Sequence, residues 1–395
     1  MLRAGQVIHL LVIATLALAV IAVHSADMRV GGSRFELMSI LTSRHVTYAG
    51  IAMVVMLLAS RLNLREAMKV RWWLNPVVLL LAGSLALVAL AMVPGVGVQY
   101  NGARRWLRIP GLGDINFQPS ELTKWAIVLV LAWWCAKRHD VMHRFGKGVL
   151  PALIIVAVAS ALVVLEDMGT AALIGVMAIM LLIAGGARIW QISLLVPPAV
   201  ALAIGAVLMK PHRVERLTTF LRPWDDMQGA GYQMVQSFVA FGEGGLLGAG
   251  LGNGIQKMGN LPTNSSDFLF AVIANELGLV GVSLVVGLFL AMLWTGLSIL
   301  KQCPDKFGRL VVLGIIATLV LQALINMAVV TGLVPTKGIA LPLLSAGGTG
   351  WIVTAFALGL VSSIDTANHI EAQGAEPEPQ ELPPALLSVS ATQFE

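Results

Sequence analysis

The sequence is poor in charged residues and in cysteine. Asp, Glu, Lys and Arg together make up 12% of its 395 residues, whereas soluble domains carry about a quarter. A soluble globular fold is therefore excluded for most of the chain. The two cysteines, Cys135 and Cys303, form no CxxC pair and no metal-ligand spacing, which indicates unpaired thiols and no metal site. The net charge of +5 is small for this length and gives no reason to expect a nucleic-acid partner.

Apolar residues are abundant instead and account for 57% of the chain. They gather into runs that approach the roughly 20 residues of helix needed to cross a bilayer. The sequence therefore predicts an all-α polytopic membrane protein with about ten transmembrane helices. The runs lie near residues 7–23, 46–60, 76–93, 121–136, 149–165, 169–187, 190–209, 268–300, 310–330 and 341–361.

The eighth run, 268–300, is too long for one straight span. It contains Gly278 and Gly281, and glycines in a long apolar helix often mark a kink. We therefore expect a bent or partly re-entrant helix here, with its non-helical backbone covered by protein.

The loops between the runs predict the topology. A long polar loop at about 210–266 separates spans seven and eight. Lys and Arg are more frequent in the short loops on the side of the N-terminus than on the other side, which predicts that both termini are cytoplasmic and the long loop is outside. We expect one membrane domain over 1–366. The segment 367–395 lacks Lys and Arg and is rich in Glu, Pro and Ala, which predicts a disordered cytoplasmic tail.

Polar residues inside the runs are few, and two pairs stand out. Glu121 and Lys124 are three residues apart, so they share one helix face. They could form a structural ion pair or line a polar cavity, because buried ionisable groups rarely face lipid. Gln322 and Asn326, four apart in the ninth run, are typical of interhelical hydrogen-bonding groups.

Two connecting segments have simpler interpretations. Glu166 and Asp167 lie in a tight turn between two runs, where a solvated turn explains two acids. The glycine-rich segment 241–254 lacks the Gly-Lys-Ser/Thr ending of a P-loop and does not follow a predicted strand. A backbone that bends closely along a groove is the better interpretation.

Asp267 stands where the long loop meets the next apolar run. A carboxylate in that place is costly unless something uses it. It could cap the helix that follows, as Asp often does before an apolar run. It could also act as a general base at the outer surface.

Several short motifs together resemble the SEDS family (shape, elongation, division and sporulation). Gly-Ala-Arg-Arg-Trp at 102–106 and Pro-Thr-Lys-Gly at 335–338 are more similar to FtsW than to RodA members of that family. The matching segments follow the family's order, at residues 101–106, 117–124, 167–170, 231–237, 262–270, 276–278, 333–338 and 341–348.

The resemblance implies a peptidoglycan glycosyltransferase in the bacterial cytoplasmic membrane. Such an enzyme polymerises lipid II on the outer face of the membrane and releases undecaprenyl pyrophosphate. The similarity to FtsW implies septal synthesis in cell division, with RodA-type elongation as the alternative. In this interpretation Asp267 is the base of an inverting reaction.

The resemblance also implies roles for other residues. Cations expected outside would bind the pyrophosphate, with Mg²⁺ or Mn²⁺ as a further aid although no metal-ligand cluster is evident. These cations are Arg104, Arg105, Lys257 and Lys337. Further substrate contacts are expected at Gln233, Gln236 and Ser237. The expected cavity and structural residues are Glu121, Lys124, Asp167 and Glu276.

The expected partners are membrane proteins of the division complex, above all a class B penicillin-binding transpeptidase that crosslinks the new strands. A rival interpretation is a transporter that flips lipid II across the membrane. A flippase is expected to carry its coupling charges near the bilayer midplane. Asp267 lies at the end of an outer loop instead, which favours the polymerase.

Overall fold

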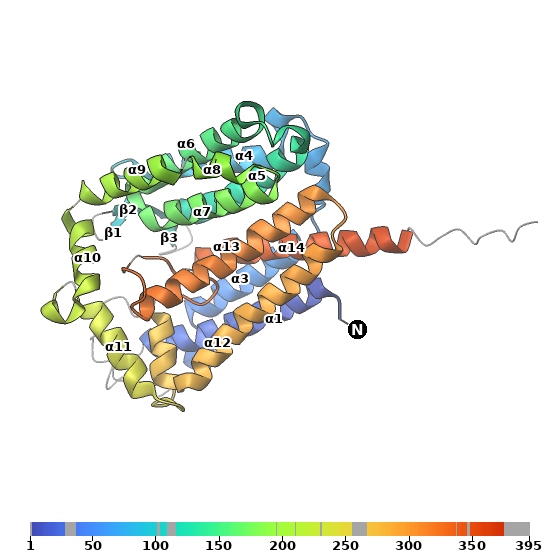
Figure 1. Ribbon diagram of the computed structural model, residues 1–395. Helices are drawn as coiled ribbons and strands as arrows, with labels where there is room; N and C mark the ends of the chain where they lie inside the picture. Colours follow the sequence, from blue (N-terminus) through green and yellow to red (C-terminus); the bar gives the residue numbers. More distant parts are fainter. Residues whose placement is uncertain are drawn as a thin grey trace, which may run out of the picture.

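The computed structural model is a bundle of long helices with a small sheet at one end (Figure 1). Two of the predicted site residues, Lys257 and Lys337, and the segment after Gly374 lie outside the described residues. The structure describes residues 2–27, 37–100, 103–108, 116–194, 196–209, 211–229, 231–254, 267–336, 338–345 and 348–374.

The predicted class is confirmed, because the described chain is mainly apolar α-helix. Five helical segments are long and apolar enough to cross a membrane, namely α1, η4 with α6, α12, α13 and α14. Shorter apolar helices stand at the other predicted positions, so the number of spans stays a prediction. The bundle helices are α1 (Ala4–Asp27), α3 (Arg44–Ala59), α4 (Pro76–Met92), α5 (Pro119–Lys137), α6 (Leu150–Glu166), α7 (Met168–Ala184), α9 (Val196–Leu208), α12 (Leu269–Gln302), α13 (Lys306–Val330) and α14 (Thr349–Gly374).

The connections hold shorter elements, several of which the sequence did not predict. The long polar loop contains α10 (Pro211–Leu221), η5 (Pro223–Asp226) and α11 (Tyr232–Gly244). A three-stranded antiparallel sheet joins α4 to α5, with β1 (Gly97–Tyr100), β2 (Ala103–Arg108) and β3 (Asn116–Phe117) in the order β1-β2-β3. The remaining short helices are α2 (Leu37–Leu41), η1 (Leu64–Met68), η2 (Trp72–Leu74), η3 (His139–Val141), η4 (Phe145–Val149) and α8 (Ile189–Ser193).

Polar side chains mark where several helices begin. The side chain of Asn75 accepts a hydrogen bond from the backbone N–H of Val77, two residues on, at the start of α4. Asp305 accepts one from Gly308 at the start of α13. These caps satisfy N–H groups that have no partner within the helix.

The kink predicted in α12 is confirmed at Gly278, which has φ 61° and ψ −154° inside an otherwise helical segment. The glycine-rich loop after α11 lies against this break. Gly245 and Leu246 accept hydrogen bonds from the N–H groups of Leu279 and Val280, and Ala249 and Gly250 donate to the carbonyls of Asn275 and Glu276. The loop therefore satisfies backbone groups that the break opens, as the predicted close bending of this backbone requires.

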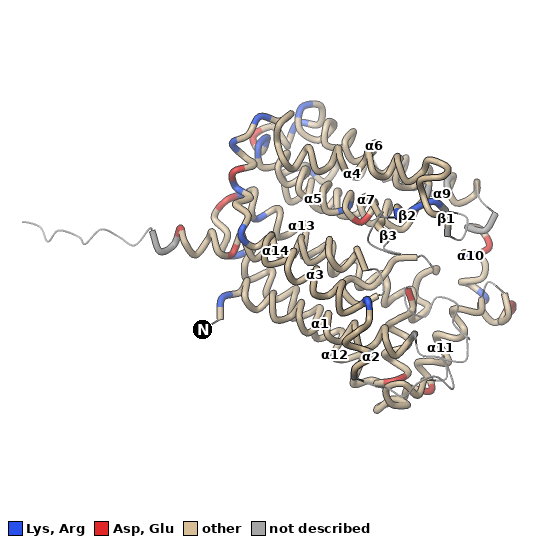
Figure 2. The backbone as a smooth tube through the Cα atoms, turned by 180° about the vertical axis from the view of Figure 1, so that it is seen from behind, with Lys and Arg blue, Asp and Glu red and all other residues tan. Residues whose placement is uncertain are grey.

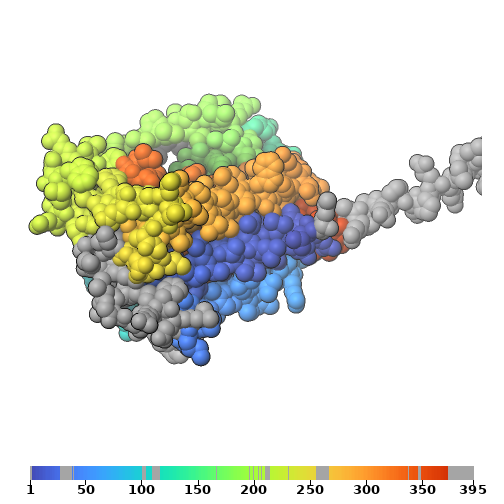
Figure 3. Space-filling view, turned by 90° about the horizontal axis from the view of Figure 1, so that it is seen from below, coloured from blue at the N-terminus to red at the C-terminus, as the bar shows by residue number. Residues whose placement is uncertain are grey.

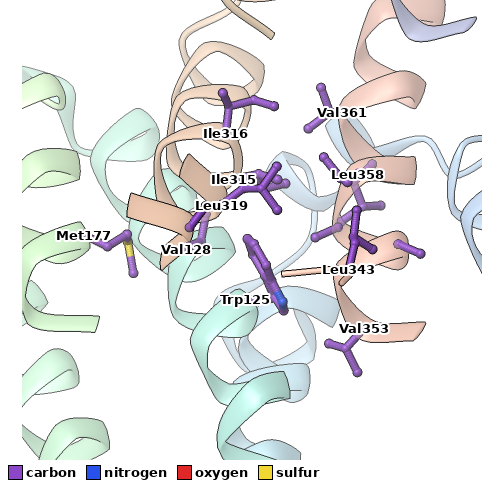
Figure 4. Close-up of a cluster of buried hydrophobic side chains, with 14 of the residues drawn as sticks. Trp125, Val128, Met177, Ile315, Ile316, Leu319, Leu343, Val353, Leu358 and Val361 are labelled. Carbon is purple, nitrogen blue, oxygen red and sulfur yellow. The ribbon is translucent and has the colours of Figure 1, made fainter. Parts of the chain in front are cut away.

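The core lies where α5, α7, α13 and α14 meet (Figure 4). Trp125 and Val128 of α5 are buried there with Leu319 of α13. Gly314 lets α13 approach α5 closely, because a β-carbon at Gly314 would lie 2.6 Å from Val128 Cγ1 of α5. Small residues commonly permit such helix contacts in membrane proteins. On another face, α1 and α12 run side by side (Figure 3).

The last predicted span, 341–361, is wrong at its start. Residues 338–345 form a non-helical segment, here called the strap, and α14 begins at Thr349. Ile339, Leu341 and Leu344 of the strap are buried in protein. Helix α14 continues to Gly374, past the predicted domain boundary at 366, and that boundary stays a prediction.

The N-terminus and the end of α14 lie at the same end of the bundle, opposite the sheet (Figure 1), and many charged residues gather there (Figure 2). Arg65 of η1 joins three segments at this end. Its guanidinium lies 2.7 Å from Asp305, between α12 and α13, and also binds Asn368 and Glu371 of α14. One side chain thus ties three separate parts of the chain together.

Candidate functional site

Asp267 and Arg105 converge at the strap, although 161 residues separate them in the sequence. A β-carbon at Gly338 would lie 3.2 Å from Asp267 Oδ2 and 3.9 Å from Arg105 Nη1. Gly338 itself is exposed. A carboxylate and a guanidinium therefore reach the same exposed point at the sheet end of the bundle.

Asp267 lies two residues before Leu269, the first residue of α12, and a backbone hydrogen bond helps to hold it in place. The N-cap position belongs to Phe268, which is buried together with Leu269. Assigning Asp267 as the N-cap residue is therefore wrong. Its carbonyl oxygen accepts a 2.8 Å hydrogen bond from Nδ2 of Asn326 in α13.

Arg105 comes from β2, which places its side chain beside α4 and α5. Its Nε is buried and makes no hydrogen bond with the described residues. Arg104 and Arg105 line a small pocket together with Ser120 and Asp167. The other lining residues are Val88, Ala91, Met92, Pro119 and Val163. A buried cationic donor without a partner is costly.

The solvated turn predicted for Asp167 is wrong, because this residue is buried. Its carboxylate accepts hydrogen bonds from the backbone N–H and hydroxyl of Thr170 at 3.0 and 2.7 Å. Gln118 and Ser120 donate to it at 3.0 and 3.3 Å. Asp167 therefore caps α7 and also lines the pocket that contains Arg104 and Arg105. The cavity role implied by the family resemblance stays a prediction.

Glu121 and Lys124 form an ion pair within α5, with Lys124 Nζ 2.7 Å from Glu121 Oε2. Lys124 is buried, and its ammonium also donates to Gln322 Oε1 on α13 at 2.6 Å. The pair therefore belongs to a buried polar network between two helices. The structural ion pair is present, and the cavity-lining role stays a prediction.

Gln322 and Asn326 carry this network to the strap. Gln322 Nε2 donates to the carbonyl of Ala340, and Asn326 Nδ2 donates to that of Ile339, each at 2.8 Å. The sequence predicted hydrogen bonds between helices for both residues. That is correct for the Lys124–Gln322 contact, but their amides bind non-helical backbone, which a helix-based prediction does not anticipate.

The remaining predicted residues lie on α11 and α12. Gln233 and Gln236 are half-buried on α11, which packs against α12. Ser237 is fully buried and donates to the carbonyl of Val330 at 2.6 Å, which leaves its hydroxyl no access to a substrate in this structure. Glu276 is buried and accepts hydrogen bonds from Ser25 of α1 at 2.6 and 2.8 Å.

Metal ligands and two of the predicted cations remain to be placed. No group of three or more His, Cys, Asp or Glu side chains within the described residues could hold a metal ion. Lys257 and Lys337 fall outside these residues, although Lys337 directly precedes Gly338 in the sequence.

The fold and this site define a polytopic helical membrane protein with a charged site at one end of its bundle. The sequence model of the FtsW, RodA and SpoVE cell cycle proteins matches residues 6–370. The chain therefore belongs to that family, as its resemblance to the SEDS proteins predicts.

Known relatives cover nearly the whole chain. The "Probable peptidoglycan glycosyltransferase FtsW" of Geobacter sulfurreducens (strain DL-1 / KN400) is 38% identical over 365 residues, which are 92% of this chain and 95% of that protein. The "Stage V sporulation protein E" of Bacillus subtilis (strain 168) is 36% identical over 360 residues, which are 90% of this chain and 96% of the relative.

Solved structures share the fold. One is a chain from a peptidoglycan synthase complex described as coordinating polymerization and crosslinking, with a TM-score of 0.72 and 28% identity over 92% of this chain and 97% of that chain. Another is the rod shape determining protein RodA of Thermus thermophilus, with a TM-score of 0.64 and 26% identity over 92% of this chain and 96% of that one.

Proposed function

We propose that this protein is a peptidoglycan glycosyltransferase of the FtsW type, which polymerises lipid II at the outer face of the bacterial cytoplasmic membrane during septal wall synthesis. The convergence of Asp267 and Arg105 at Gly338 carries the proposal. The reaction needs a base for the acceptor hydroxyl and cations for the leaving group, and these two side chains supply both.

In the proposed reaction a hydroxyl of the acceptor sugar attacks the anomeric carbon of the donor. Its proton passes to the Asp267 carboxylate while the new C–O bond forms. The bond between the anomeric carbon and the pyrophosphate oxygen breaks, and undecaprenyl pyrophosphate leaves with the electron pair. One base and direct displacement give inversion at the anomeric carbon.

Arg105 would receive the pyrophosphate as negative charge develops on it. Its unpartnered Nε supports this role, because guanidinium groups bind phosphate through paired N–H donors. Arg104 lines the same pocket, and the proposal retains Lys257 and Lys337 as further cations. Gln233 and Gln236 remain proposed substrate contacts, and a divalent cation, Mg²⁺ or Mn²⁺, remains a proposed companion of the pyrophosphate.

The test is polymerisation of lipid II by the purified protein with a class B transpeptidase. We expect glycan strands from the wild type and none from Asp267→Asn. Asp225→Asn is the matched control, because Asp225 is an exposed acid of the same long loop, 4.0 Å from Arg222. Equal product from wild type and Asp267→Asn would remove Asp267 as the base.

Further assays test the flippase and RodA alternatives and the dependence on a divalent cation. Lipid II flipping in vesicles without any polymer would favour a transporter. Complementation of division but not of elongation mutants would separate the FtsW role from the RodA role. Assays with Mg²⁺, Mn²⁺ or EDTA would measure the cation dependence directly.

We also propose that a class B penicillin-binding transpeptidase and other division-complex membrane proteins bind this chain at the septum, with both termini cytoplasmic. The structural likeness to a chain of a peptidoglycan synthase complex supports such a partner. Copurification with the transpeptidase, fluorescence at the division site and protease protection of terminal tags would test the three parts separately.

A further inference from the structure

We infer that Asn326 is a positioning residue for the Asp267 carboxylate. Its single amide group binds the backbone of Asp267 and the backbone of the strap, and so fixes the position of one relative to the other. The inference rests on the proposed function of Asp267 as the base. It concerns a residue that acts through the backbone of Asp267, because its amide binds backbone carbonyls.

The geometry of the amide carries the inference. The two N–H groups of Asn326 Nδ2 meet two acceptors, the carbonyls of Asp267 and Ile339, both at 2.8 Å. Because Gly338 precedes Ile339, the same amide holds the two backbone segments that meet at the Asp267 carboxylate.

The surroundings make this link rigid. Asn326 is buried, and a hydrogen bond shielded from water is stronger than an exposed one. Its Oδ1 is buried without a hydrogen-bond partner among the described residues, which carries a desolvation cost. A residue that only filled space would avoid that cost, so the two donors are the reason for an asparagine here.

The rest of the strap is held independently. Gln322 donates to the carbonyl of Ala340, while the strap residue Ser345 accepts from the N–H of Leu341 and, through its carbonyl, from Trp351 Nε1. Loss of the Asn326 amide should therefore shift Asp267 and Ile339 locally without releasing the whole strap.

The experiment compares Asn326→Leu and Asn326→Ser with wild type in the reconstituted polymerase assay. Leu keeps the size and removes both donors, whereas Ser keeps one donor. Thr318→Val is the matched control, because Thr318 is also buried on α13 and its hydroxyl donates to the carbonyl of Gly314 in the same helix. We expect kcat to fall by about tenfold to a hundredfold in Asn326→Leu and by less in Asn326→Ser. KM for lipid II should stay within about twofold, since a misplaced base affects the chemical step.

Hydrogen–deuterium exchange gives a readout that does not depend on activity. We expect faster exchange in peptides covering 267–272 and 338–345 of Asn326→Leu, with the rest of α13 unchanged. A wild-type kcat in this variant, or equal loosening along the whole of α13, would overturn the inference. If wild type and Asp267→Asn both failed to polymerise, the proposed function would fail, whereas the exchange data would still report on the link.

Discussion

The backbone at Gly338 passes so close to Asp267 that a β-carbon there would lie 3.2 Å from Oδ2. That separation is tight for a carbon–oxygen contact, so a methyl group would push the carboxylate aside. The absence of a side chain at Gly338 therefore sets where the carboxylate can stand.

Gly338→Ala should lower the rate of glycan polymerisation by about tenfold or more, because small displacements of a catalytic group are costly. Folding should be unaffected, since Gly338 is exposed. The control is Gly287→Ala, which meets nothing within 4 Å in α12. Equal activity of the two variants would show that the contact with Asp267 is unimportant.

Arg105→Lys should impair polymerisation, because an ammonium cannot reproduce the planar donor set of a guanidinium. Arg108→Lys, at the exposed end of the same strand, should retain activity. Steady-state kinetics on lipid II would measure both. An active Arg105→Lys would indicate that only a positive charge is needed at this position. An inactive Arg108→Lys would show that activity is sensitive to changes anywhere in β2, and not specifically to the arginine that lines the pocket.

Lys124→Met should destabilise the protein by about 3 kcal/mol, because it leaves Glu121 without its ion partner in a largely buried place. The double variant Glu121→Gln/Lys124→Met removes both charges and should recover part of that loss. Thermal unfolding in detergent would compare the three proteins. If both variants were equally destabilised, loss of the Lys124–Gln322 contact would be the main cause.

Gly278→Ala should destabilise the break in α12. The backbone there has φ 61°, and a β-carbon would lie 2.5 Å from the backbone nitrogen of Gly248. We expect a loss of about 1–3 kcal/mol from backbone strain alone, visible as a lower melting temperature in detergent. Gly242→Ala, with nothing within 4 Å, serves as the control and should melt like wild type.

The Cys303 thiol should react slowly with maleimide at neutral pH. Burial, reinforced by the negative charge of Asp305, raises its pKa from 9.0 to about 11, and the thiolate is the reactive form. In a Cys135→Ala background, the labelling rate should rise about tenfold for each pH unit up to about pH 11. Protein unfolded in SDS should label faster at pH 8, and equal rates would contradict the shielded environment.

How far the sequence predicts this molecule depends on whether the determining contacts are local. Helix positions, the kink at Gly278 and the pairing of Glu121 with Lys124 follow from composition and short spacings, and all are present. The strap does not follow, because an apolar segment such as 341–344 has the same composition whether lipid or protein buries it.

The sequence also does not predict the small sheet or the proximity of Asp267 to Arg105. Two- to six-residue strands carry too little periodic signal. The family resemblance named both residues, but their proximity depends on how β2, α12 and the strap pack. Asn326 stands out in the sequence as a polar residue in an apolar run, yet its acceptors belong to backbone that the predicted helices do not include.

Arg65 forms ion pairs with Asp305 and Glu371, which join separate parts of the chain at one end of the bundle. The backbone N–H of Gly5 in α1 also bonds to Asp365 of α14 at that end. These contacts hold the end of α14 to the start of α1 and to the connection between α12 and α13. A rearrangement of the bundle that admits a lipid-linked sugar would therefore have to keep these helix ends in place.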